Sequence, residues 1–152
     1  MRDPTADASR MTDTTVEYFV SDLFAIEPGE DDFTNPYRFG KQLAYWLEQR
    51  LSEHGYHHVT VTPEDWGWCV MCSREEGMLW VGCASYIDGE IEEGHLPAKK
   101  DIIWHCFATI EQPLLKRLFS SSEGKNKLEK LKKELKRVIH EEESFRIVQE
   151  PE

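Results

Sequence analysis

The side chains best able to do chemistry in this chain cluster in the run Pro63-Glu64-Asp65-Trp66-Gly67-Trp68. Two adjacent carboxylates at the entrance of a strand could pair as acid and base or bind a cation. In a strand, however, neighbouring side chains point to opposite faces, so Glu64 and Asp65 do not easily share a proton. The sequence therefore favours a structural role for the run over a catalytic one.

The same run also makes sense as a structural corner. Asp65 can accept backbone N–H bonds at a turn, and Trp66 and Trp68 can anchor a sheet with their large apolar surface. Alternation places both tryptophans on one face and Gly67 on the other, where a helix or a bound group could approach closely.

His105 is a second candidate, set in the apolar run Ile103-Trp104-His105-Cys106-Phe107. Imidazole titrates near neutrality, so His105 could serve as a general base. A structural role is favoured because no nucleophile motif accompanies it: the chain has no Gly-x-Ser-x-Gly, no phosphate-cradling glycine loop and no His-Glu-x-x-His. No catalytic residue is predicted.

Four cysteines, Cys69, Cys72, Cys83 and Cys106, raise the alternatives of two disulfides or a metal site. All four lie inside apolar runs, where a free thiol behaves as a small hydrophobe. Residues three apart in a strand point to opposite faces, so Cys69 and Cys72 cannot both reach one ion without a bulge. We predict reduced core thiols, with no metal and no cofactor.

The elements that must position these residues are mostly strands. Apolar, β-branched and aromatic runs predict strands at 15–26, 58–62, 66–73, 78–87 and 101–110, with an edge strand at 145–148. The short link at 73–77 predicts a hairpin. The long acidic link at 88–97 lacks the glycine and glutamate of a calcium loop and is interpreted as a solvated connection, or else as a binding element.

Two amphipathic helices are expected on this sheet. Asn35 is a suitable N-cap, Pro36 suits the first helical position, and Gly55 fits the left-handed residue that ends a helix. A lysine-rich helix is predicted at 123–143 with a leucine stripe, and a short one at 114–119. The predicted fold is α+β, an antiparallel sheet of about four to six strands with one N-terminal and one long C-terminal helix, spanning residues 14–152 after a disordered tail at 1–13.

Composition restricts the function classes. The chain has a net charge of −11, with 8 basic and 21 acidic side chains in residues 1–115 and 9 basic and 3 acidic ones in residues 116–137. An acidic body disfavours nucleic acid, because affinity for phosphate comes mainly from Lys and Arg. No run is long and apolar enough to cross a membrane, and the N-terminus lacks the apolar core of a signal peptide, so a cytoplasmic location is expected.

A resemblance rests on Asn35-Pro36, Phe39-Gly40, the run from Glu64 to Trp68, and Leu79-Trp80-Val81-Gly82-Cys83. Over residues 33–87 these elements resemble a group of small bacterial proteins sharing the Glu-Asp-Trp-Gly-Trp element. The resemblance brings no activity, so it implies no catalytic residue. In size and acidity the chain is also similar to immunity proteins that neutralise bacterial toxins.

The strands are apolar on both faces, so helices, a second copy or another protein must cover the second face. We therefore predict a non-enzymatic, acidic protein-interaction domain that binds a basic partner or itself. The alternative is a small ligand-binding domain or enzyme. The lysine-rich helix could also contact anionic surfaces, which the acidic body opposes. In the alternative, the pocket would lie near Glu64, Asp65 and His105. The candidate binding residues are Glu64, Asp65, Trp66, Trp68, Trp80 and His105.

Overall fold

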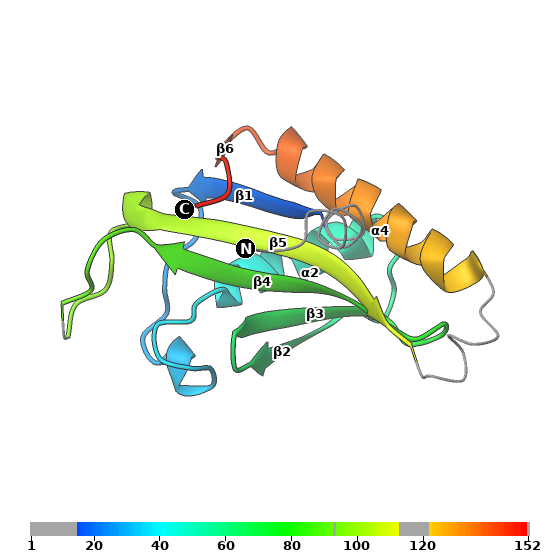
Figure 1. The fold of residues 1–152 in the computed structure, drawn as a ribbon, viewed down its shortest axis with the longest axis horizontal. Helices are drawn as coiled ribbons and strands as arrows, with labels where there is room; N and C mark the ends of the chain where they lie inside the picture. Colours follow the sequence, from blue (N-terminus) through cyan, green and yellow to red (C-terminus); the bar gives the residue numbers. More distant parts are fainter. Residues whose placement is uncertain (1–14, 93, 113–121, 152) are drawn as a thin grey trace, which may run out of the picture.

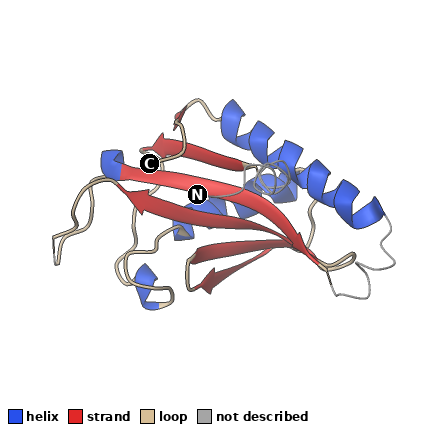
Figure 2. Cartoon of the chain, in the orientation of Figure 1, coloured by secondary structure: helices blue, strands red, loops and turns tan. Residues whose placement is uncertain are grey.

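The computed structural model describes residues 15–92, 94–112 and 122–151, and these form a sheet with helices packed against it (Figures 1 and 2). The strands within this part are β1 (Val16–Ser21), β2 (Thr60–Glu64), β3 (Gly67–Ser73), β4 (Met78–Ile87), β5 (Ile102–Glu111) and β6 (Phe145–Ile147). The helices are α2 (Lys41–Glu53) and α4 (Ser122–Glu141), with short 3₁₀ turns η1 (Glu30–Asp32) and η2 (Lys99–Asp101). The predicted α+β class is confirmed. The predicted tail at 1–13 and helix at 114–119 lie outside the described residues.

The sheet is antiparallel throughout the described chain, with strand order β2-β3-β4-β5-β1-β6. Strands β2 to β5 follow one another as a meander, and β1 then pairs with β5 through Tyr18 opposite His105. β6 pairs with the outer side of β1, which confirms the predicted edge strand. Figure 1 shows α2 behind the sheet and α4 running beside its upper part.

Burial alternates along the central strands and distinguishes two faces. On β5, Ile102, Trp104, Cys106 and Ala108 are buried, whereas the residues between them are only partly buried. The buried set joins residues of both helices in one core cluster, so we call this side the helix face. The opposite side, which the described helices do not cover, is called the open face. The alternation follows from the period of two in a strand.

Helix α2 begins later than the sequence predicts. It starts at Lys41, not near Asn35 and Pro36, because Tyr37 adopts a left-handed conformation with φ 64° that a continuous helix cannot contain. Asn35 uses its backbone N–H to bind the carbonyl of Asp65 at 2.8 Å. The predicted end of the helix is confirmed, since Gly55 has φ 97° directly after the last turn.

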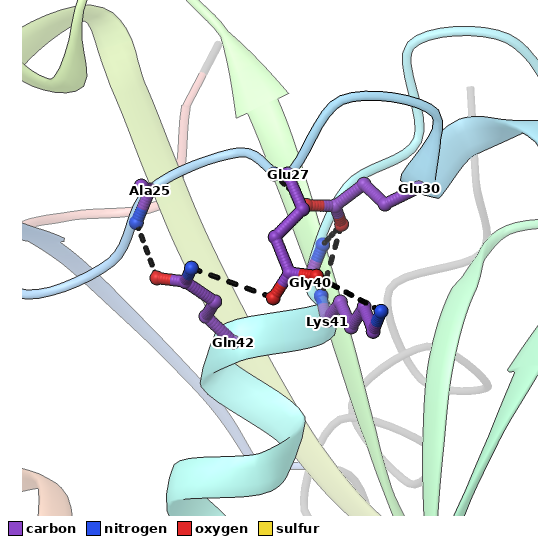
Figure 3. A network of polar contacts seen from close by, with 6 residues as sticks. All are labelled: Ala25, Glu27, Glu30, Gly40, Lys41 and Gln42. Atoms are coloured by element: carbon purple, nitrogen blue, oxygen red, sulfur yellow. Dashed lines mark hydrogen bonds and ion pairs between the residues drawn. The ribbon is translucent and has the colours of Figure 1, made fainter.

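A buried carboxylate caps α2 from a distance in sequence (Figure 3). Glu30 is 3% exposed, and one of its oxygens accepts the backbone N–H groups of Gly40 and Lys41, both at 3.1 Å. Its other oxygen accepts the N–H of Glu27 at 2.8 Å. A negative charge at this position satisfies helix N–H groups that lack partners and complements the positive end of the helix dipole.

Helix α4 packs through the stripe that the sequence predicts. Leu131, Leu135, Val138 and Ile139 are buried in the common core. At the end of the helix, His140 Nε2 lies 2.9 Å from the buried Glu17 Oε2 on β1. This contact gives the carboxylate on the helix face a polar partner, as a buried charge requires.

Candidate functional site

The open face carries a continuous row of aromatic rings in contact, some stacked and others tilted or edge-on. Trp66 stacks on Trp80 with centroids 5.5 Å apart, and both contact Phe107 at 5.8 and 5.7 Å. The row continues on the other side of Phe107 through His105, Tyr86 and Tyr18, whose ring centroids are 4.8 to 6.4 Å apart. Rings at such separations attract one another, so the row is a preformed surface.

Glycine makes room for this row. Gly82 lies directly opposite Phe107 in the β4–β5 pairing, and a Cβ added to Gly82 would lie 2.4 Å from the Phe107 ring. The space beside Gly82 is therefore occupied by a neighbouring ring. A Cβ on Gly67 would lie 2.5 Å from the carbonyl oxygen of Cys83, so the close approach at Gly67 is that of strand β4.

Trp66 and Trp68 lie on opposite faces, which corrects the sequence-based expectation. Asp65 and Trp66 form the turn between β2 and β3, and the strand begins only at Gly67. Alternation therefore starts anew after Trp66, and the Trp66 ring reaches the open face. Trp68 is 4% exposed on the helix face, where the ammonium of Lys41 lies 6.0 Å from its ring centroid.

His105 lies in the middle of the row and is held neutral. Burial lowers the pKa of His105 to about 4, and the positive charge of Arg38 adds to the effect. Its Nδ1 is buried and has no hydrogen-bond partner within the described part of the chain. Neighbouring Tyr18 has a pKa raised to about 12, mainly by burial and then by the charge of Glu150. The centre of the row is thus uncharged at neutral pH.

Carboxylates border the row at the β2 and β5 sides. Strand register places Glu64 of β2 opposite Gly67, and alternation places Glu111 on the same face of β5 as Phe107. Burial, followed by the charges of Glu64 and Glu111, raises the pKa of the Cys69 thiol to about 11. Glu64 and Asp65 are exposed at the turn. Among the described residues, no hydrogen bond or ion pair connects these two carboxylates to His105.

The loop between η1 and α2 extends the surface. It presents Phe33 and Tyr37, which are 68% and 44% exposed, and the Asn35–Asp65 backbone bond holds it against the β2–β3 turn. The positive charge of Arg38 in this loop also contributes to the lowered pKa of His105. Sequence reasoning missed the loop, although its two aromatic residues among polar neighbours were a visible signal.

The cysteines are free and buried, as predicted. Burial raises the pKa of Cys72 to about 12, and burial with the neighbouring Cys106 thiol also raises the pKa of Cys83. Cys83 and Cys106 are directly opposite on β4 and β5. The described residues include no group of three or more His, Cys, Asp or Glu side chains placed to hold a metal ion.

The fold and this surface together define an α+β domain in which the described helices cover one sheet face and not the other. Comparison with family models, curated proteins and solved structures finds no match to this chain. In the described residues, no helix combines the length and the apolar character needed to span a membrane.

Proposed function

We propose that this chain is a non-enzymatic protein-interaction domain whose open face binds a basic partner protein. The observation that carries the proposal is the row of contacting aromatic rings on a sheet face that the described helices leave uncovered. Tryptophan and tyrosine dominate the binding energy of protein interfaces because they bury large areas at small cost in side-chain entropy. An immunity protein that neutralises a basic toxin is the specific form of this proposal.

The charge distribution supports a basic partner. The whole chain carries −11, and strand register places Glu64 on β2 and Glu111 on β5 at the open face. Opposite charge on the partner would steer association, and salt would slow it. An enzyme or ligand pocket at Glu64, Asp65 and His105 receives less support, because these groups do not converge in hydrogen bonds or ion pairs within the described chain.

Affinity capture from a lysate of the source organism at low salt tests the proposal. We expect wild-type protein and the matched control Tyr45→Ala, whose exposed ring is on α2, to recover the same basic protein. Trp80→Ala and Phe107→Ala should lose it, and wild type should release it as salt is raised. A partner that all four proteins retain equally, or no partner for a strictly monomeric wild type, would contradict the proposal.

A further inference from the structure

A cavity lies at the end of the sheet opposite the Asp65–Trp66 turn. Its volume is about 750 Å³, within the size range of small-molecule sites. Three segments far apart in sequence build it: the link from Gly55 to Thr60 after α2, the end of β3 with its turn to β4, and the first half of α4. The sequence could not indicate this site because each segment contributes only a few side chains.

A β-bulge helps to open the cavity. Met71 pairs with Trp80 but Ser73 pairs with Leu79, so Cys72 is an extra residue on β3. Bulges bend a strand and interrupt its pairing, and they occur often beside binding sites. At the other wall, a Cβ added to Gly55 would meet no atom within 4 Å, so this wall is not packed against protein.

The lining divides into an apolar floor and a basic rim. Tyr56, Met71, Cys72 and Leu79 supply the floor. Burial raises the pKa of Tyr56 to about 12 and that of Cys72 to about 12, so the phenol and the thiol there stay neutral. A ligand's apolar body would therefore contact uncharged surface.

The rim is cationic in an otherwise acidic protein. Arg74, Lys127 and Lys130 line the cavity, together with the imidazoles of His57 and His58. Glu75 is the one carboxylate among the described lining residues. Its oxygen lies 2.9 Å from Lys127 Nζ, and this hydrogen bond lowers the pKa of Glu75 and raises that of Lys127. The lining thus keeps an excess of positive charge where the whole chain carries −11.

We propose that this cavity binds a small amphipathic organic anion, with its carboxylate, sulfonate or phosphate group at Arg74 and Lys130 and its apolar body on the floor. Guanidinium and ammonium groups are the side chains that bind such anions. Glu75 moderates the site, since it neutralises Lys127 at the rim.

The test uses the fluorescent probe anilinonaphthalene sulfonate with the full chain at low salt. We expect saturable binding at one site that decanoate displaces and decanol does not. The double variant Arg74→Gln/Lys130→Gln should weaken binding about tenfold, because it removes two cations from the rim. Glu75→Gln should tighten binding several-fold, because it releases Lys127 from its carboxylate partner.

Two controls match the charge changes. Lys136→Gln removes a cation from another side of α4, and Glu90→Gln removes an exposed carboxylate from the 88–97 link, so both should bind the probe as wild type does. Circular dichroism melting checks that each variant folds. Equal affinity in the double variant, equal displacement by decanol, or no saturable binding by wild type would overturn the proposal. Tyr86→Ala, at the end of the ring row away from the cavity, should keep the probe, which separates this site from the open face.

Discussion

The helix face and the open face of the sheet both carry large aromatic residues, but the surroundings of these residues differ. On the helix face Trp104 is 1% exposed and meets Phe24 edge-on at 5.9 Å, enclosed by both helices. On the open face Tyr86 is 43% exposed, and its main ring contact is His105 at 4.8 Å. One face uses aromatic rings to fill a closed core, and the other displays them as a surface.

The apolar content of a strand therefore does not reveal which of its faces is covered. The two faces differ in the polar groups that accompany the rings. Carboxylates on the helix side have specific partners, as Glu17 has His140 and Glu30 has the N-terminus of α2. Glu64 at the end of β2 and Asp65 in the β2–β3 turn are exposed instead, and solvent satisfies them at no cost.

Truncating one ring on each face gives the largest expected effect. Trp104→Ala should lower the free energy of unfolding by about 3–5 kcal/mol, because it leaves a closed cavity. Trp80→Ala should cost only about 1–2 kcal/mol, because its ring is partly buried and its removal opens to solvent. Urea unfolding measures both values. Equal losses of unfolding free energy in the two variants would show that the open face is part of the closed core.

The second test uses pH, because His105 is the titratable ring at the centre of the open-face row. Its pKa falls from 6.5 to about 4 on folding, through burial and then Arg38. The unfolded chain therefore binds a proton more readily, and stability is lost as pH falls from about 6.5 to about 4. Between pH 7 and pH 4.5, wild type should lose roughly 2 kcal/mol more than His105→Gln.

Unfolding curves at both pH values measure this difference. Titration of other groups is common to the two proteins and cancels when they are compared. Tyr18, which contacts the imidazole, has a pKa raised to about 12, so it remains neutral in this range and does not compensate a charge on the imidazole. A parallel pH dependence of wild type and variant would show that His105 is solvated, and hence that the row is looser than its ring contacts indicate.

The third test concerns Glu30, the buried carboxylate that caps α2. Glu30→Gln should lower stability by about 1–3 kcal/mol, because charge-assisted bonds to two backbone N–H groups become neutral ones. The control is Glu27→Gln in the same network, where the partner Lys41 is at the surface and the loss should be smaller. Chemical unfolding compares the two. A larger loss in Glu27→Gln would show that the surface pair, not the buried cap, fixes the start of α2.

Local pattern was enough to predict much of the fold. β4 has the predicted bounds, and the end of α2 at Gly55 follows from a conformation that glycine alone adopts easily. The start of α2 could not be predicted, because its cap comes from Glu30, ten residues before Gly40. A contact across a loop leaves no periodic signal near the helix.

The candidate site was predictable in its residue types but not in its arrangement. Trp66, Trp80 and His105 were chosen from sequence and do share the open face. The sequence predicts Trp68 on the same face as Trp66 because strand alternation is extended across a turn, where alternation does not hold. The cavity was missed for another reason: its basic rim combines Arg74 with Lys130 through tertiary packing.

The smallest expected effect concerns the thiols, which occur on both faces. Cys69 is on the open face, opposite Gly82, whereas Cys83 and Cys106 are on the helix face and have no exposed area. All should react slowly with Ellman's reagent in the native state, since burial keeps the reagent away from the sulfur atoms. As pH is raised to 9, Cys69 should react first, because local opening of a face that the described helices do not cover costs less free energy than opening the core.

Mass spectrometry of partly labelled protein identifies the cysteine that reacts first, with Cys69→Ser as the matched control. Earlier labelling of Cys83 would mean that the helices separate from the sheet more readily than the aromatic rings separate from one another. The helix face would then be the more dynamic of the two faces.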